Sequence, residues 1–128
     1  MQIRHVVIKV DDQDKALAFY TTILRFVKKL DFSGAIRYLT VVSPEGEEGV
    51  ELVLEPNHFP AALASQKALY DADFPATIFP TNDIAAEYKR LMSLCVKFRE
   101  EAKRMGPVTL AFFDDTCGNL IVLNQRTA

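Results

Sequence analysis

Apolar and polar residues alternate along HVVIKV, at residues 5–10. Strict alternation of this kind predicts a β-strand with one covered face. The apolar residues at positions 6, 8 and 10 would form the covered face, and His5, Val7 and Lys9 would lie on the opposite one. Asp12 then offers an N-cap, and apolar residues at helical spacing over residues 16–27 predict an amphipathic helix that lies on the covered face.

The pattern predicts three more strands in the first half of the chain. They lie near residues 26–32, 36–43 and 49–56, and the polar segment SPEGEEG forms the turn between the last two. In the last of these strands, Glu51 and Glu55 share a face with Val53. Two carboxylates on one strand face need water, a cation or a partner.

The order of elements then repeats. FPAALASQKALYDADFP has a proline near each end and a helical apolar pattern, so it predicts a connecting helix. After it come a short strand, an Asp83 cap, and a helix with Ile84, Tyr88, Leu91 and Met92 inward. Strands are expected at residues 96–103, 108–113 and 119–125, with DDTCGN as the turn before the last. The repeat rests on element order and on the position of the caps.

We therefore predict an α+β fold of two βαβββ modules in a single domain over residues 1–128. Module one covers about residues 1–57, the connecting helix about 60–72 and module two about 75–128.

Composition narrows the function classes. Fifteen basic and seventeen acidic residues give a formal net charge of −2, without a basic run, so nucleic acid is not an expected partner. The first residues reach charge too early for a signal peptide or a membrane span, so we expect a cytoplasmic protein with no membrane partner. The two cysteines, Cys95 and Cys117, are expected to be free thiols.

The uncovered sheet face is where a small ligand would bind. His5, Glu51 and Glu55 point to it by parity, and a histidine beside a carboxylate is half of a divalent-metal site. Alternatively, His5 pairs with Glu51 without a metal, and Glu55 is solvated at a strand end. Arg37, Tyr38 and Thr40 lie on a strand that could line this face. Arg37 could hold a carboxylate or phosphate there, although a surface position for Arg37 is equally compatible with the pattern.

Several segments together resemble the vicinal oxygen chelate superfamily, which includes glyoxalase I, bleomycin-resistance proteins and extradiol dioxygenases. The segments are HVVIKVDDQDKALAFYTTILRF, YLTVVSPEG, VELVLEPN, NDIAAEYKRL and FDDTCGNLIVL. The resemblance covers nearly the whole chain. It implies a cup-shaped mixed β-sheet with helices on the outer face, a small-molecule ligand and a homodimer.

The resemblance also implies metal ligands on the first and fourth strands of each module. His5 and Glu51 match these positions in module one, but the equivalent positions in module two are Ala76 and Val122, which cannot bind a cation. A full metal site therefore cannot form, and a symmetric homodimer does not restore it. A ligand pocket would be lined by Arg37, Tyr38, Val53, Ala76 and Val122.

Two function classes follow from the resemblance. The first is a small-molecule-binding protein of the bleomycin-resistance type that requires no cofactor, although a divalent metal at His5 and Glu51 is compatible with it. The second is a lyase, isomerase or dioxygenase that uses His5 and Glu51 as catalytic residues, with or without metal. Standard glyoxalase I activity is not expected.

One local feature has a consequence for stability. Arg25 and Cys95 stand where relatives tend to carry the glycine that ends each helix. A residue other than glycine is strained in the left-handed conformation that follows many helices. Either the helices end differently in this protein, or some stability is lost.

Overall fold

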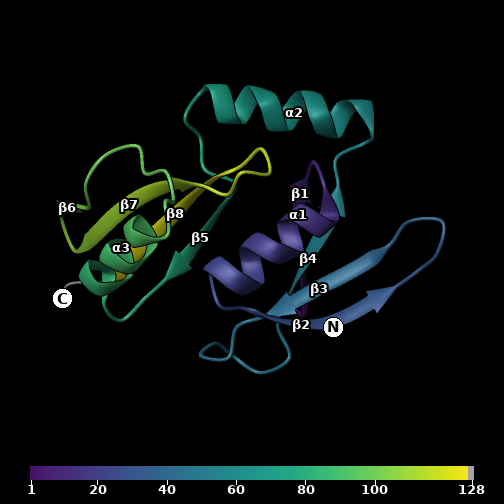
Figure 1. Cartoon of the computed structure of the whole chain (residues 1–128), viewed down its shortest axis with the longest axis horizontal. Coiled ribbons are helices and arrows are strands. Elements are labelled where there is room, and N and C mark those ends of the chain that lie inside the picture. The colour runs from purple at the N-terminus through teal and green to yellow at the C-terminus, as the bar shows by residue number, and fades with distance from the viewer. Residues whose placement is uncertain (127–128) are drawn as a thin grey trace. The chain divides into compact units, whose positions relative to one another are not determined.

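A computed structural model describes residues 1–126 and has an α+β fold. The chain forms two compact units, Met1–Gln66 and the part from Lys67 onward. Each contains one four-stranded mixed sheet (Figure 1), as the repeated element order predicted. Among the described residues, no helix combines the length and the apolar character needed to cross a membrane.

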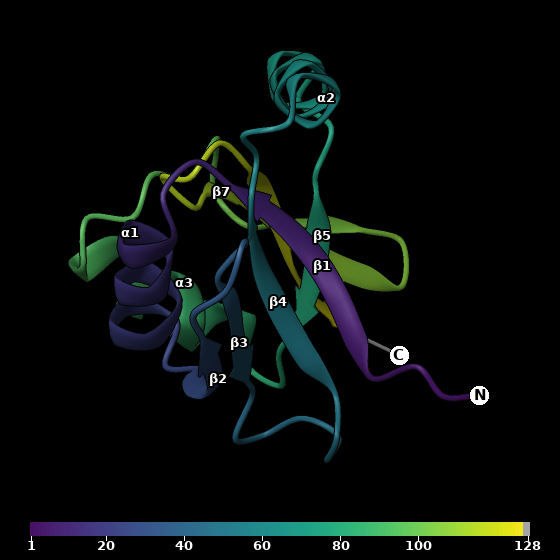
Figure 2. The same cartoon turned by 90° about the vertical axis from the view of Figure 1, so that its right-hand side faces the viewer.

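The sheet of the first unit has the order β1-β4-β3-β2. Its strands are β1 (His5–Val10), β2 (Val27–Phe32), β3 (Tyr38–Val42) and β4 (Glu51–Pro56). β1 runs parallel to β4, and the other pairs are antiparallel (Figure 2). The parallel register places His5 directly beside Glu51 and Lys9 beside Glu55. The polar residues of both strands therefore share one sheet face.

Helix α1 (Gln13–Ala18) covers part of the apolar face of this sheet and continues as a π-helical turn, Phe19–Ile23. The Asp12 carboxylate caps it by accepting a hydrogen bond from the Lys15 N–H at 3.0 Å. Apolar packing there buries Tyr20 completely. Val6, predicted on the covered face, is 47% exposed, so the covered part of β1 is its second half.

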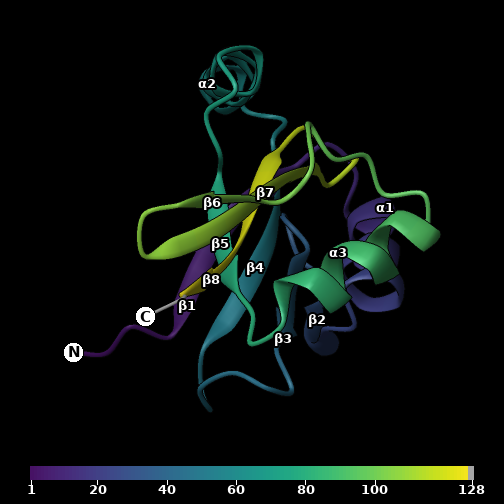
Figure 3. The ribbon, with the colours of Figure 1, turned by 90° about the vertical axis from the view of Figure 1, so that its left-hand side faces the viewer.

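The second unit repeats this topology in the order β5-β8-β7-β6 (Figure 3). Its strands are β5 (Thr77–Pro80), β6 (Lys103–Met105), β7 (Val108–Asp114) and β8 (Leu120–Arg126). Helix α3 (Ile84–Ser93) packs on β7 and β8 and is capped by Asp83, whose carboxylate accepts from the Ala86 N–H at 3.0 Å. Ile84 and Leu91 are buried as predicted, but Met92 is 48% exposed.

The predicted strand at residues 96–103 is shorter than expected. Phe98 forms a single bridge with Phe113, and regular pairing resumes only at Lys103. The intervening residues 99–101 are all charged, so they lack the alternation that would let one face be buried.

Helix α2 (Pro60–Asp71) lies between the two sheets in the sequence, where a connecting helix was predicted. Gln66 is buried, and its amide group donates to the backbone carbonyl of Lys9 at 2.9 Å and accepts from Asn57 at 2.6 Å. The contact fixes the middle of the helix to the end of β1 within the first unit.

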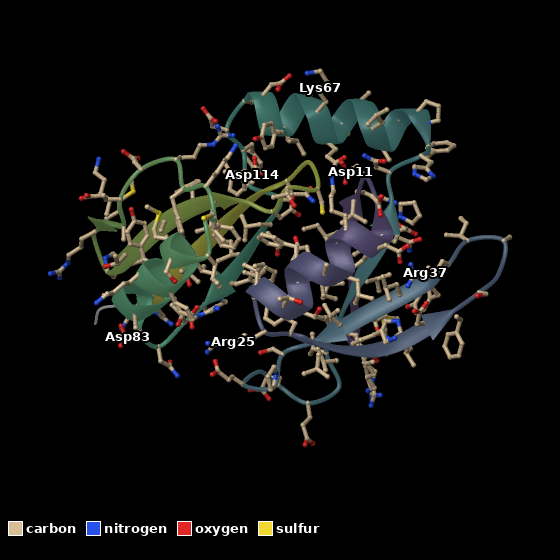
Figure 4. The ribbon with its side chains drawn as sticks, viewed as in Figure 1. Asp11, Arg25, Arg37, Lys67, Asp83 and Asp114 are labelled. Carbon is tan, nitrogen blue, oxygen red and sulfur yellow. The ribbon has the colours of Figure 1, made fainter. Side chains whose placement is uncertain are left out.

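Arg25 and Cys95 both adopt the left-handed conformation, with φ of 66° and 65°. Arg25 follows the first helix (Figure 4), and Cys95 follows α3. Both helices therefore end in the left-handed conformation that favours glycine, and the residues at these two positions are strained.

We expect Arg25→Gly and Cys95→Gly each to raise the free energy of unfolding by about 0.5–1 kcal/mol, because glycine adopts this conformation without strain. Urea unfolding of the single variants and the double variant would measure the change. Lys89→Gly is the matched control, because residue 89 is exposed inside α3 and glycine there should cost about 1 kcal/mol. A loss of stability at positions 25 and 95 would contradict the strain argument.

Candidate functional site

His5 and Glu51 meet at the start of the parallel strands β1 and β4. The His5 Nε2 atom lies 3.3 Å from Glu51 Oε2. The two side chains differ in environment, because 40% of the His5 side chain is exposed but only 6% of that of Glu51. Sequence parity predicted this pair, and the parallel register brings it together.

Two further side chains hold the Glu51 carboxylate. The Thr40 hydroxyl, fully buried on β3, donates a hydrogen bond to Oε1 at 2.7 Å, and the Lys29 ammonium lies 3.6 Å from Oε2. The Thr40 hydrogen bond lowers the pKa of Glu51, and the charges of Lys29 and His5 add to this, while burial acts in the opposite direction. Glu51 is therefore held as a carboxylate.

Tyr38 completes the arrangement from β3. Its hydroxyl group is hydrogen-bonded to His5 Nδ1, and the two rings are tilted by 40°. An ionised carboxylate can only accept hydrogen bonds, so a neutral His5 carries its proton on Nε2 and accepts from Tyr38 on Nδ1. The result is a continuous hydrogen-bonded chain from Tyr38 through His5 to Glu51. We call these five residues, His5, Lys29, Tyr38, Thr40 and Glu51, the Glu51 cluster.

The sequence placed Thr40 on a strand that could line this face but did not indicate its hydrogen bond to Glu51, and it gave no role to Lys29. Thr40 lies two residues after Tyr38, so strand parity alone places the two on one face. No such signal exists for Lys29, because the pairing of β2 with β3 is irregular between Lys28 and Asp31, which breaks the parity rule.

Arg37 lies outside the Glu51 cluster. Its guanidinium group donates to Asp31 at 2.8 and 2.9 Å and to Asp14 of α1 at 2.6 Å. These hydrogen bonds raise the pKa of Arg37, and the hydrogen bond from Arg37 lowers the pKa of Asp31. Arg37 therefore reaches the helix side of the sheet, as Figure 4 shows, while its neighbour Tyr38 reaches His5. The structure therefore does not bring the Arg37 side chain to the Glu51 cluster, because consecutive residues of an extended chain point to opposite sides.

Val53 and Glu55 share the face of Glu51 on β4. Val53 is 4% exposed, and Glu55 forms an ion pair with Lys9 on the adjacent strand. The carboxylate of Glu55 is therefore neutralised by a residue of its own unit, which is one of the options, besides water and a bound cation, that the sequence left open.

The remaining predicted pocket residues lie in the second unit. Val122 is nearly buried in β8 and pairs with Ile78, while Ala76 precedes β5 and donates its N–H to the carbonyl of Leu120 at 2.8 Å. Ala76 and Val122 are therefore not directly opposite each other. They differ in this from His5 and Glu51, the directly paired residues to which the sequence analysis matched them. In either register, the paired positions carry apolar side chains that cannot bind a metal.

The donor atoms present do not fit a tightly held divalent metal. Within residues 1–126, no group of three or more histidine, cysteine, aspartate or glutamate side chains could hold one. One Glu51 oxygen already accepts from Thr40, and the other lies beside the Lys29 ammonium, which repels a second cation. Two donors beside a fixed positive charge bind a metal weakly.

Comparison with known proteins agrees with this fold. The family model described as "Glyoxalase/Bleomycin resistance protein/Dioxygenase superfamily" matches residues 2–123. A relative from Bacillus subtilis (strain 168), "Uncharacterized protein YurT", is 50% identical over 127 residues, which cover 98% of this chain and all of that protein. The predicted resemblance and the predicted α+β fold are thereby confirmed.

Solved structures are similar over nearly the whole chain. The crystal structure of UcmS2 has a TM-score of 0.82 at 32% identity and covers 97% of both chains. That of TnmS3, described as an antibiotic binding protein from Streptomyces sp. CB03234, has a TM-score of 0.78 at 27% identity and covers 98% of this chain and 96% of that one.

Proposed function

The chain belongs to the glyoxalase/bleomycin resistance protein/dioxygenase superfamily, and on that premise we propose that it binds and sequesters a small organic molecule of antibiotic type. The similarity to TnmS3 carries the proposal, because that antibiotic binding protein matches this chain over 98% of its length. Binding and sequestration require a site of suitable shape and polarity, but no metal and no chemical step.

The chemistry of the Glu51 cluster supports binding without a metal. Two of the four positions that would carry metal ligands, Ala76 and Val122, are apolar, and Lys29 neutralises the carboxylate that remains. Metal-dependent relatives use the ion to polarise a substrate oxygen. Without enough ligands to hold the ion, this chain is better suited to hydrogen bonding and apolar contact with a ligand.

The proposal includes a homodimer in the cytoplasm, with a small-molecule ligand and neither nucleic acid nor membrane as a partner. The superfamily resemblance supports the dimer, and the net charge of −2 argues against nucleic acid. Light scattering coupled to size-exclusion chromatography would measure the oligomeric state directly.

A thermal-shift screen against a panel of antibiotics tests the proposed function. A ligand at about a hundred times its Kd should stabilise the protein by about 2.7 kcal/mol, because it binds only the folded state. We expect that EDTA does not change the stabilisation by a bound antibiotic and that Tyr38→Phe reduces it. Tyr70→Phe in the second unit is the matched control. Stoichiometric metal held by His5 in protein purified without chelator would contradict the metal-free reading.

A second candidate is an acid–base enzyme that uses His5 and Glu51 as the catalytic residues. The hydrogen-bonded chain from Tyr38 to Glu51 favours it, because a histidine held by a carboxylate is a common general base. Mass spectrometry of a bound ligand before and after incubation separates the two candidates. Chemical conversion that is lost in Glu51→Gln would favour the enzyme, and an unchanged ligand would favour sequestration.

A further inference from the structure

Lys29 supplies a positive charge beside the buried carboxylate of Glu51. We infer that its ammonium group takes the place of a divalent metal ion there, and that it donates hydrogen bonds to an uncharged acceptor oxygen of the ligand, such as that of a ketone or an amide. The inference rests on the proposed function, because it names the ligand chemistry of the same site. It is carried by the contacts, the exposure and the charge of Lys29.

The path of β2 brings Lys29 to this carboxylate. Consecutive strand residues point to opposite faces, and the two neighbouring lysines of β2 have different partners. The Lys29 ammonium lies 3.6 Å from Glu51 Oε2, whereas that of Lys28 lies 3.9 Å from Asp31 Oδ2. Asp31 in turn accepts from Arg37. Lys29 therefore belongs to the Glu51 cluster, and Lys28 belongs to the separate group of charges around Arg37.

The ammonium keeps its hydrogen-bond donors for a ligand. An N–H···O hydrogen bond usually spans about 2.7–3.2 Å. At 3.6 Å, charge attraction therefore holds Lys29 beside Glu51 without a short hydrogen bond. A lysine ammonium has N–H donors and no lone pair, so its partner must supply an acceptor. Because the Lys29 side chain is 48% exposed and that of Glu51 only 6%, a ligand on this face meets the ammonium first.

The charges on this face favour an uncharged ligand oxygen. Lys29 balances Glu51, and Lys9 forms an ion pair with Glu55, so these four residues carry no net charge. A ligand carboxylate would bring a third negative charge to two cations. A carbonyl oxygen accepts a charge-assisted hydrogen bond and leaves the balance unchanged. Val7, which is exposed and has the strand parity of Lys9, offers apolar contact to the rest of the ligand.

Lys29 also accounts for the poor fit of a divalent metal. An ion bound to Glu51 Oε2 would lie close to the ammonium, and like charges at such a separation repel each other even in water. Lys29→Met removes this repulsion and leaves His5 and Glu51 as two donors. Methionine keeps an unbranched, flexible side chain without a charge. The variant should therefore bind a divalent ion more tightly than the wild-type protein does.

Calorimetric titration of the untagged full chain with Ni²⁺ tests this consequence. We expect Lys29→Met to bind Ni²⁺ about tenfold more tightly than the wild-type protein, because the repulsion of a divalent ion is relieved. Lys28→Met is the matched control, because it removes the same charge from the next residue of β2. Adding Glu51→Gln to Lys29→Met should abolish the gain. Equal nickel affinities for Lys29→Met and Lys28→Met would overturn the inference.

A second variant guards against a loss of folding. Lys29→Gln also removes the charge, and it should gain nickel affinity as Lys29→Met does. Thermal unfolding followed by circular dichroism identifies which variants are folded, and the nickel comparison uses those.

Acetophenone, benzoate and ethylbenzene test the ligand group, because they share an aromatic ring and differ in the acceptor. Chemical-shift titration of the backbone amides measures their affinities. We expect acetophenone to bind the wild-type protein more tightly than the other two, and to bind Lys29→Met about fivefold more weakly. Lys28→Met should bind it as the wild-type protein does. A preference for benzoate, an acetophenone affinity unchanged in Lys29→Met, or no acetophenone binding at millimolar concentration would overturn the inference.

The outcomes separate this inference from the proposed function. Antibiotic hits that stabilise the wild-type protein and Lys29→Met equally would keep the proposed function and reject the role of Lys29. The expected nickel and acetophenone results without any antibiotic hit would keep the role of Lys29 and reject antibiotic binding.

Discussion

Replacing Asp115 by alanine should lower the free energy of unfolding by about 2–4 kcal/mol. The side chain is fully buried, and its carboxylate accepts from the backbone N–H groups of Cys117 at 2.7 Å and Asn119 at 3.0 Å. It also accepts from the Asn119 side-chain amide at 2.8 Å. Alanine would leave these buried donors without their acceptor, and each such loss costs about 1–3 kcal/mol before relaxation.

Urea unfolding of Asp115→Ala beside Glu100→Ala would measure this effect, because residue 100 is an exposed acid of the same unit. The control is expected to change stability by less than about 0.5 kcal/mol. Asp115→Asn should fall between the two, because its remaining oxygen can still accept from the backbone. A loss below about 1 kcal/mol in Asp115→Ala would show that water or a rearranged turn replaces the carboxylate.

Thr40→Val should be the most disruptive conservative change in the Glu51 cluster, with a loss of about 2 kcal/mol. The hydroxyl group donates to Glu51 Oε1 and accepts from the Leu30 N–H at 3.1 Å. Valine has nearly the same shape and neither function, so it leaves a buried carboxylate and an N–H group short of partners. A double-mutant cycle with Glu51→Gln would isolate the coupling between residues 40 and 51.

The same variants should change how stability depends on pH. The folded protein lowers the pKa of Glu51 below its usual value of 4.5, chiefly through Thr40. The resulting stabilisation is present above that usual value and is lost as pH falls through the lowered pKa. Urea unfolding between about pH 7 and pH 3 should therefore show a weaker acid dependence in Thr40→Val and in Glu51→Gln. An unchanged dependence in both would contradict the role of the Thr40 hydrogen bond.

Local patterns predicted most of the fold. Alternation placed β1 and β4, Asp12 and Asp83 marked both helix starts, and the repeated order gave two modules of one topology. The predictions of burial failed at two positions where the sequence pattern alone does not determine which side chains are covered. Val6 and Met92 belong to apolar patterns but remain exposed, because a pattern does not show how far a covering element extends.

Strand parity by itself determined that His5 and Glu51 face the same side, and the residue types at positions 76 and 122 predicted that no complete metal site forms. The tertiary structure decided which groups surround the carboxylate. Thr40 and Lys29 reach it from two other strands, and Arg37 turns to α1. The physical reason is that parity follows from the backbone geometry of one strand, whereas ion pairs depend on register across strands and on an irregularity in β2 that no local pattern encodes.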